Sequence, residues 1–309
     1  MRDPPPAAGN AAPALSENAL GMIAMTAAMA FFIFNDALVK LLAERLPLSQ
    51  ILFSRGLIAT LLLTVIGLAL RQIKPLPRDA TRPLALRIVG ELSATLLYLT
   101  ALINMPLANA TAIMQAIPLA MTVAAALLLG EVVRWRRWTA ILVGFLGMLL
   151  IVRPGAEGFS IYSLMVVGAV LAVVLRDMST RHMPRGVSSL QITLIAMACV
   201  ALMGAVMGLL TGGWVSPTLR ELIFLAIASS FLSAAFYAIT IGARYGDVSL
   251  VSPFRYTVLL WAILLGWLIW GDLPDLLASL GAFLIIGSGL YVFQRERALG
   301  RYDATSSQP

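Results

Sequence analysis

The sequence predicts an all-α polytopic membrane protein whose ten transmembrane helices form two inverted five-helix repeats. Of its 309 residues, 60% are hydrophobic and 12% are charged, whereas an ordinary soluble domain has about 25% charged residues. The apolar residues are grouped in runs of about 20, the length that a helix needs to cross about 30 Å of hydrocarbon. The second half of the chain also repeats the pattern of the first. These observations exclude a water-soluble domain.

Ten apolar runs predict the membrane spans. The expected spans are residues 20–41, 48–70, 84–104, 107–130, 137–153, 160–182, 188–210, 219–242, 249–270 and 275–294. Residues 1–18 contain Pro4, Pro5, Pro6 and Pro13 and little hydrophobicity, which is typical of a disordered tail. Residues 295–309 form a second polar tail. An even number of spans places both tails on one side of the membrane.

The basic residues favour a cytoplasmic location for both tails, because Lys and Arg accumulate in cytoplasmic loops. With a cytoplasmic N-terminus, that side carries fourteen of them: Arg2, Arg71, Lys74, Arg78, Arg82, Arg134, Arg136, Arg137, Arg181, Arg185, Arg244, Arg295, Arg297 and Arg301. The opposite side carries four, Lys40, Arg45, Arg153 and Arg220. The sequence therefore predicts a multi-pass protein of the inner (plasma) membrane. Because the basic residues flank the spans and form no single patch, we expect no nucleic-acid partner.

An internal repeat appears when the chain is aligned with itself so that Asp36 falls on Asp177, an offset that we call the repeat displacement. The same displacement pairs Lys40 with Arg181, Gln50 with Gln191, Gly130 with Gly271, and Glu131 with Asp272. A two-residue gap also pairs Tyr98 with Tyr237. Each half then contains five spans, and an odd number of crossings makes the two halves enter the membrane from opposite sides. The repeats are therefore expected to be inverted.

Inverted repeats are typical of secondary transporters that work by alternating access, with the substrate near the membrane midplane at the repeat interface. A duplicated membrane scaffold without transport is the alternative reading of the same pattern. One cysteine, Cys199, and one histidine, His182, exclude an intramolecular disulfide and a histidine-based metal site or dyad. We expect no cofactor, no metal and no enzymatic activity.

Four stretches carry a resemblance to a known family. They are ALINMPLANATAIMQAIPLAMTVAAALLLGE (Ala101–Glu131), GARYGDVSLVSPFRYTVLLWAILLGWLIWGD (Gly242–Asp272), FSRG (Phe53–Gly56) and GAFLIIGSGLYVFQRE (Gly281–Glu296). The chain resembles the EamA-type members of the drug/metabolite transporter superfamily over residues 20–296. The resemblance implies two repeats, over residues 19–153 and 160–294, between the two tails. In the second repeat the acidic residue after glycine is Asp272, whereas the family usually has a glutamate there.

Ionisable residues inside the spans are the first candidates for function, because each costs about 2.5–3.5 kcal/mol in hydrocarbon unless it has a partner or a wet cavity. By the predicted orientation, Asp36 and Arg55 lie in the outer half of the membrane. Glu91, Arg176, Asp177 and Arg255 lie in the inner half. Two charge clusters at different depths could act as gates. For Arg176 and Asp177, simple placement near the cytoplasmic interface is an equal alternative.

Polar side chains also form stripes along three spans. Thr95 and Tyr98 follow Glu91 on one helix face, and Thr111, Gln115 and Thr122 repeat the pattern in the next span. Pro118 is expected to bend that span near Met114. Ser252, Arg255 and Tyr256 form the corresponding cluster in span nine, and Asn35 and Tyr237 complete the candidate binding residues. The alternative reading of these groups is interhelical hydrogen bonding.

Charges of both signs beside aromatic rings favour a zwitterionic substrate with an apolar or aromatic side chain. EamA-type members include exporters of amino acids and related metabolites, so the resemblance supports export of aromatic or large neutral amino acids. An uptake carrier is the nearest alternative, and a channel or a membrane enzyme are further ones. The expected partners are a small-molecule substrate and the lipid bilayer, with protons as a candidate coupling ion.

Overall fold

The computed structural model describes residues 17–128, 135–153, 160–184, 186–245 and 251–306. All regular structure in these ranges is helical. The first half contains α1 (Glu17–Leu42), α2 (Leu48–Ala69), η1 (Arg78–Ala80), α3 (Thr81–Asn104), α4 (Leu107–Met114), α5 (Ile117–Leu128) and α6 (Trp135–Val152). The second half contains α7 (Ile161–Arg181), α8 (Ser189–Thr211), α9 (Leu219–Tyr245), η2 (Ser252–Tyr256), α11 (Thr257–Trp270) and α12 (Leu276–Ser306).

The ten predicted spans are confirmed as helical segments. Within the described residues, 8 segments are long and apolar enough to cross a membrane, and α4 with α5 and η2 with α11 each count as one of them. Two shorter apolar helices, Trp138–Val152 and Leu276–Tyr291, complete the set. Local sequence sets several boundaries: Ser160 and Ser188 cap α7 and α8 by accepting backbone N–H groups, and Gly271 ends α11 at φ 72°.

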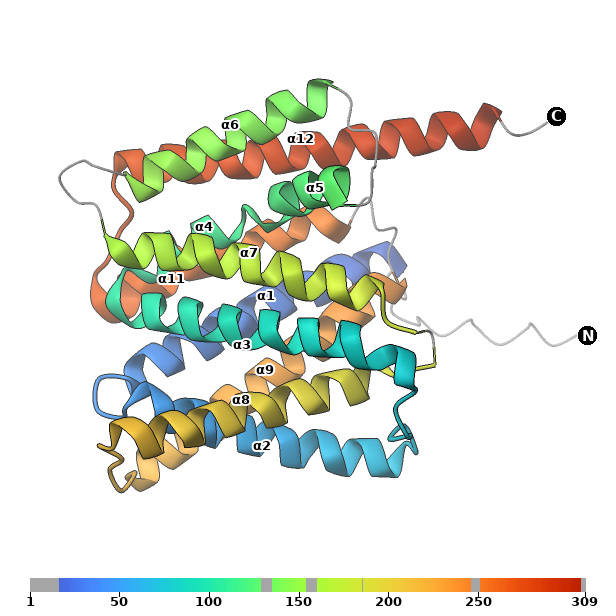
Figure 1. The fold of residues 1–309 in the computed structure, drawn as a ribbon. Helices are drawn as coiled ribbons and strands as arrows, with labels where there is room; N and C mark the ends of the chain where they lie inside the picture. Colours follow the sequence, from blue (N-terminus) through green and yellow to red (C-terminus); the bar gives the residue numbers. More distant parts are fainter. Residues whose placement is uncertain (1–16, 129–134, 154–159, 185, 246–250, 307–309) are drawn as a thin grey trace, which may run out of the picture.

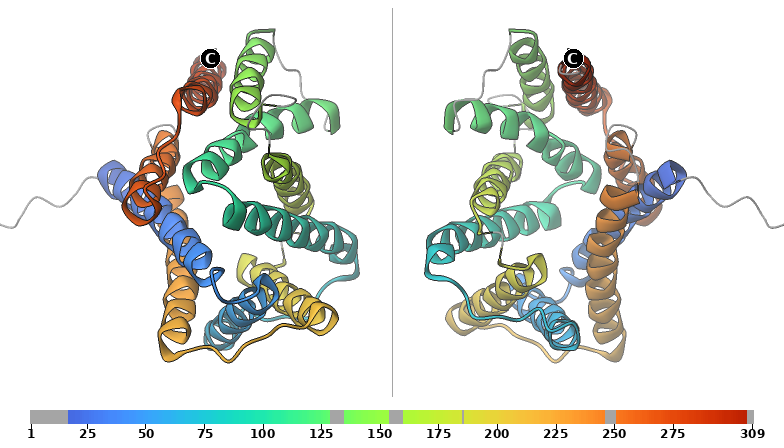
Figure 2. Two further views of the ribbon diagram at one scale, coloured as in Figure 1. Left: turned by 90° about the vertical axis from the view of Figure 1, so that its left-hand side faces the viewer. Right: turned by 90° about the vertical axis from the view of Figure 1, so that its right-hand side faces the viewer.

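The helices pair across the two repeats. α1 packs against α9, α3 against α7, α2 against α8 and α6 against α12. Figure 1 shows α1 running away from the end at which α12 finishes, while α7 runs towards that end. Seen nearly along the helix axes in Figure 2, the α2–α8 and α6–α12 pairs lie at opposite edges of the bundle. The predicted fold of two inverted five-helix repeats is confirmed.

Two glutamine side chains show the repeat symmetry at atomic detail. Gln50 near the start of α2 donates to the Val215 carbonyl at 2.7 Å and accepts from the Val215 N–H at 3.1 Å. Gln191 near the start of α8 makes the same pair of bonds with Lys74, at 2.5 and 3.4 Å. The repeat displacement relates Gln50 to Gln191 and Lys74 to Val215, so the two clamps are equivalent. Such reciprocal contacts are what a two-fold axis produces.

Glycines bring α2 and α8 into close contact between these clamps. A Cβ added at Gly56 would lie 2.7 Å from the Ala201 backbone nitrogen, and one added at Gly204 would lie 2.7 Å from the Ser49 carbonyl oxygen. Both distances are too short for an ordinary contact. The two helices therefore form a tightly packed pair of the kind that small residues permit in membranes.

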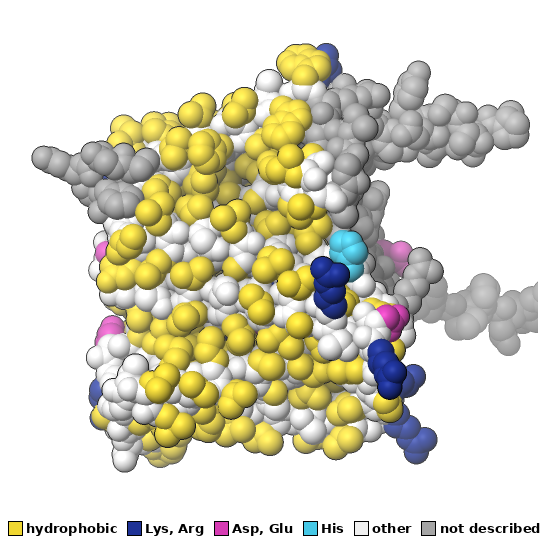
Figure 3. All heavy atoms as spheres, in the orientation of Figure 1, with side chains coloured by type: hydrophobic (Ala, Val, Ile, Leu, Met, Phe, Trp, Pro, Cys, Tyr) yellow, Lys and Arg dark blue, Asp and Glu magenta, His cyan; other side chains and the backbone are white. Residues whose placement is uncertain are grey.

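We call the end of the bundle where α1 begins and α12 finishes the terminal end, and the opposite end, which holds Arg45 and Arg153, the distal end. Figure 3 shows a broad hydrophobic belt with Lys and Arg side chains gathered at the terminal end. The belt matches a membrane-facing surface.

Two features refine or correct the sequence predictions, and two predicted parts of the chain cannot be compared with the structure. Span four is split, because α4 ends at Met114 and α5 begins at Ile117, beside Pro118 as expected. The C-terminal tail predicted from residue 295 is helical as far as Ser306, since α12 continues beyond its apolar part. Residues 1–16 of the predicted N-terminal tail, and the pair Gly130 and Glu131, lie outside the described residues.

Candidate substrate-binding cavity

A cavity of about 740 Å³ lies between the two repeats. Helices α1, α9, α11 and η2 contribute to its lining together with α2, α3, α4, α5, α7, α8 and α12. Of the residues predicted from sequence, it brings together Asn35, Asp36, Arg55, Glu91, Thr95, Tyr98, Thr111, Gln115, Arg176, Asp177, Arg255 and Tyr256. The arrangement can hold a small organic molecule with charged groups.

The deep cluster, formed by Asn35, Asp36, Arg55 and Tyr98, lies near the closed bottom of the cavity. One Asp36 carboxylate oxygen accepts from the Asn35 Nδ2 at 2.9 Å, and the other accepts from the Tyr98 hydroxyl at 2.7 Å. Arg55 lies close enough for its charge to attract that of Asp36. Because Asp36 is buried at 9% exposure, these partners offset the loss of water around its charge.

Two polar atoms of the deep cluster have no hydrogen-bond partner among the described residues. They are the buried Arg55 Nε and the buried Asn35 Oδ1. Most buried polar atoms in folded proteins are paired, so each exception needs a reason. Both residues line the cavity, so an unpaired donor and an unpaired acceptor lie in its wall, buried from water in this conformation.

The mouth cluster, formed by Arg87, Glu91, Arg176 and Asp177, lies nearer the terminal end. Arg87 Nη1 donates to Glu91 Oε2 at 3.1 Å, and Arg176 Nη1 lies 3.6 Å from the same oxygen. Arg176 Nε donates to Asp177 Oδ1 at 2.8 Å. Glu91 precedes Tyr98 by two helical turns of α3, or about 10 Å along its axis. The predicted charges therefore form two clusters at different depths, although their action as gates stays a prediction.

Both fourth spans are interrupted at the cavity. The junction of α4 and α5 lies at Gln115, and the junction of η2 and α11 lies at Tyr256, the residue that the repeat displacement pairs with Gln115. Both residues line the cavity, and Tyr256 lies against Gly289, where a Cβ would overlap its hydroxyl. Interrupted helices at corresponding positions of two halves are typical of a transport site.

Apolar side chains form the remaining wall, and sequence reasoning missed most of them. Phe32 and Phe236 meet edge to face with ring centroids 5.5 Å apart, and the wall also includes Met29, Ile33, Met114, Met121, Leu232, Ile239 and Val258. Three of these wall residues could have been predicted from the internal repeat. Its displacement, applied without a gap, pairs Glu91, Thr95 and Tyr98 with Leu232, Phe236 and Ile239, which occupy the corresponding face of α9.

One predicted residue does not join the cavity lining, and the side chain of another is not described. Tyr237 is 71% exposed and absent from the lining, which contains Ile239 in the place related to Tyr98. The gap that pairs Tyr98 with Tyr237 shifts the alignment by two residues, and two residues turn a helical side chain by about 200°. Ser252 begins η2, but its side chain lies outside the described part of the chain.

The distal end of the cavity is closed. Val39, Leu102, Leu107 and Ala262 are fully buried beyond the lining. Lys40 Nζ donates to the Met105 carbonyl at 2.6 Å and lies 5.0 Å from the centroid of the Trp270 ring. These contacts join α1 to the α3–α4 connection and to α11. At the other end Arg255 and Pro118 line the cavity and are exposed, so the opening faces the terminal end.

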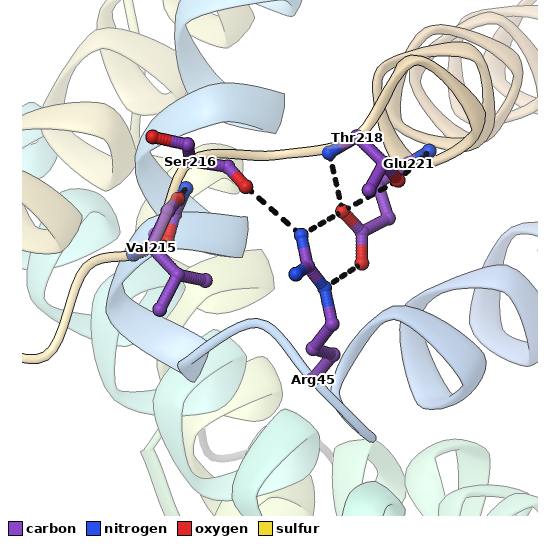
Figure 4. A network of polar contacts seen from close by, with 6 residues as sticks. Arg45, Val215, Ser216, Thr218 and Glu221 are labelled. Atoms are coloured by element: carbon purple, nitrogen blue, oxygen red, sulfur yellow. Dashed lines mark hydrogen bonds and ion pairs between the residues drawn. The ribbon is translucent and has the colours of Figure 1, made fainter.

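Two ion pairs lie at the distal surface. Figure 4 shows Arg45 holding Glu221 with two hydrogen bonds, at 2.5 and 2.6 Å, and donating to the Ser216 carbonyl. The contact with Glu221 raises the pKa of Arg45. Arg153 contacts Asp275, whose pKa is held below its usual value first by the Ala278 backbone N–H and then by Arg153. Both pairs link separate segments at this end.

Among the described residues, no three His, Cys, Asp or Glu side chains are grouped to hold a metal ion. The site instead offers two charge clusters, hydroxyl and amide groups, and aromatic rings. Such groups bind and orient a solute.

Comparison with known proteins identifies relatives of the whole fold. The EamA-like transporter family is matched twice, by residues 19–153 and 160–294. The pseudopaline exporter CntI of Pseudomonas aeruginosa is 31% identical over 275 residues, covering 86% of this chain and 92% of the exporter. A riboflavin transporter of Brucella anthropi is 26% identical over 239 residues, covering 73% of this chain and 84% of that protein.

Other relatives match over a shorter length. An S-adenosylmethionine uptake transporter of Rickettsia bellii is 28% identical over 195 residues, and the match covers 62% of this chain and 65% of that protein. A solved crystal structure superposes with a TM-score of 0.60 at 20% identity, covering 91% of this chain and 99% of the other, which supports the fold alone. The paired family matches show that this chain belongs to the EamA-like transporter family and is a multi-pass membrane transporter.

Proposed function

We propose that this transporter exports amino acids, aromatic or large neutral ones, and related metabolites across the inner membrane by alternating access. In the proposed orientation both chain ends are cytoplasmic, in keeping with the basic residues at the terminal end. The cavity then opens to the cytoplasm, where an exported solute must enter.

The observation that carries the proposal is the state of Arg55, which lies beside Asp36 and whose Nε has no hydrogen-bond partner among the described residues. The rest of the cavity wall is mostly apolar. A zwitterion offers a carboxylate to the guanidinium and an ammonium to an acceptor. Its side chain can then contact Phe32 and Phe236. A free phosphate would make no use of the aromatic wall.

Transport then requires the distal end to open and the terminal end to close around the bound solute. The inverted repeats supply two related arrangements of the same helices, and exchange between them moves the opening from one end to the other. Lys40 is the group that must release Met105 and Trp270 for the distal end to open.

Counterflow in proteoliposomes tests the proposal. Vesicles loaded with unlabelled phenylalanine, leucine, lysine or glutamate are diluted into the labelled amino acid. We expect saturable exchange for the aromatic and large neutral amino acids and little for lysine. Linear, non-saturating flux would indicate a channel, and a chemical change of the solute without movement would indicate an enzyme. Absence of exchange for every amino acid would reject amino-acid transport.

Uptake is the second candidate, because an S-adenosylmethionine uptake transporter is among the relatives. Net movement from vesicles of known orientation, with the solute gradient reversed in a matched experiment, distinguishes the two directions. A pH step across the same vesicles tests proton coupling. Stimulation of solute movement by an opposing proton gradient would support exchange with protons, and no response would support a uniporter.

A further inference from the structure

We propose that Arg55 and Asn35 form a subsite for the amino-carboxylate end of the solute. The carboxylate would bind the Arg55 guanidinium and the ammonium would bind the Asn35 Oδ1. This inference rests on the proposed function and assigns its substrate head group to particular atoms. It predicts that both charged groups of the solute contribute to binding, and that each depends on a different residue.

Arg55 supplies the donor side of the subsite. Within the described residues, its guanidinium makes no hydrogen bond or ion pair, and its Nε is buried. A guanidinium has five N–H donors and no acceptor. Asp36 attracts Arg55 through its charge, while its two oxygens accept one bond each from Asn35 and Tyr98 and none from Arg55. Arg55 therefore has donors available for a second carboxylate.

Asn35 supplies the acceptor side. Its side chain is 2% exposed, and the bond from Nδ2 to Asp36 fixes the orientation of the amide, because a carboxylate oxygen accepts and cannot donate. Within the described ranges the amide oxygen is left without a donor, although the residue lines the cavity. A buried acceptor of this kind is stabilised by a solute N–H, and an ammonium carries up to three.

The other charged residues of the cavity fit this role less well. Glu91 is engaged by Arg87 and Arg176, and Arg176 is also bonded to Asp177. Arg255 is exposed near the mouth. The deep cluster differs because its unpaired donor and acceptor lie on two different helices at the closed bottom of the cavity. A solute held there would extend its side chain along the apolar wall.

The test compares three ligands that differ at one group each: phenylalanine, its methyl ester, and 3-phenylpropanoate, which lacks the amine. Binding is measured by calorimetry in detergent with the full chain. The wild-type protein should bind phenylalanine about tenfold or more tightly than either analogue, because a charge-assisted hydrogen bond contributes more than about 1.4 kcal/mol.

Variants assign each preference to a residue. Arg55→Gln should abolish the preference for phenylalanine over the ester and keep the preference over 3-phenylpropanoate. Asn35→Leu should show the reverse pattern. Arg220→Gln, which changes an arginine outside the cavity, is the matched control and should behave as wild type. Arg55→Lys, which keeps the charge, should retain a reduced preference and guards against a variant that fails to fold.

The outcomes separate this inference from the proposed function. Counterflow of amino acids by the wild type, with equal binding of phenylalanine and both analogues, would overturn the subsite and leave amino-acid transport in place. Equal weakening of all three ligands in Arg55→Gln would also overturn it, since the arginine would then support the fold alone. No binding and no counterflow of any amino acid would reject the proposed function itself.

Discussion

The two ends of the transporter differ in burial although the repeats that build them are related. At the distal end Val39 and Ala262 are completely buried. Their counterparts under the repeat displacement are Thr180, which is exposed, and Met121, which lines the cavity. The glutamine clamps, by contrast, are alike at both ends. Contacts that obey the two-fold axis are therefore expected to persist through transport, and contacts that depart from it are expected to define the present conformation.

Disrupting the Lys40 contacts should have the largest effect, because we expect these contacts to keep the distal end closed. Lys40→Met removes the hydrogen bond to Met105 and the cation–π contact with Trp270. A hydrogen bond to a charged group contributes about 1.5–3 kcal/mol, so the population open at the distal end should rise by about tenfold or more. The measurement is the labelling rate of Ala262→Cys by an impermeant thiol reagent in a Cys199→Ser background.

Lys74→Met is the matched control for that variant. Lys74 is exposed at the terminal end, and its hydrogen bonds to Gln191 come from its backbone. The same substitution there should leave labelling unchanged. Equal labelling of the Lys40→Met variant and its parent would show that Lys40 does not hold the distal end closed.

Breaking the mouth cluster should impair transport without loss of insertion. Glu91→Gln removes the negative charge that faces both Arg87 and Arg176. We expect the initial rate of counterflow to fall by about tenfold, a change in barrier of about 1.4 kcal/mol. Arg255→Ala, which removes a charge that lines the cavity outside this cluster, should also reduce that rate. Membrane content measured by immunoblot is the control, and normal rates for both variants would show that these charges serve the structure alone.

Matched substitutions of the two clamps should have equal effects. Gln50→Leu and Gln191→Leu each leave one backbone N–H and one carbonyl without a partner. Each should lower stability by about 1–3 kcal/mol and the thermal midpoint by several degrees. Neither should alter labelling of Ala262→Cys. A shift in labelling for one clamp alone would contradict their assignment to a scaffold that persists in both conformations.

Breaking the exposed ion pair between Arg153 and Asp275 should have the smallest effect, a slight loss of stability. Because the pKa of Asp275 is lowered in the folded protein, the carboxylate stabilises the fold above its unfolded pKa of about 3.9. That contribution is lost as the pH falls through the lowered value. Asp275→Asn should therefore reduce the thermal midpoint slightly at neutral pH and not in acid below the lowered pKa. A difference that grows on acidification would have the wrong sign.

Much of the fold was predictable because its signals are long and repeated. The ten apolar runs indicated the helices to within a few residues, and the repeat displacement indicated the inversion. Pro118 located the interruption of span four. The continuation of α12 to Ser306 was not predicted, because a polar segment gives no apolar periodicity although it can form a helix.

The candidate site was predictable as a set of residues and not as a set of partners. A charge inside a span identifies Asp36, Arg55 or Glu91 as candidates. Only the packing of helices decides that Tyr98 bonds Asp36 and that Arg55 Nε stays unpaired within the described residues. Tyr237 illustrates a further limit. A gap of two residues in a weak alignment is enough to place a side chain on the wrong face of a helix.

Spin-label distances across both ends of the cavity test the central claim most directly. In the Cys199→Ser background, one pair, Asn104→Cys and Leu273→Cys, lies across the distal end, and a second pair, Leu20→Cys and Thr180→Cys, lies across the terminal end. Alternating access predicts two distances for each pair, with solute changing their populations in opposite directions at the two ends. Both ends opening together, or one end staying fixed during transport, would contradict it.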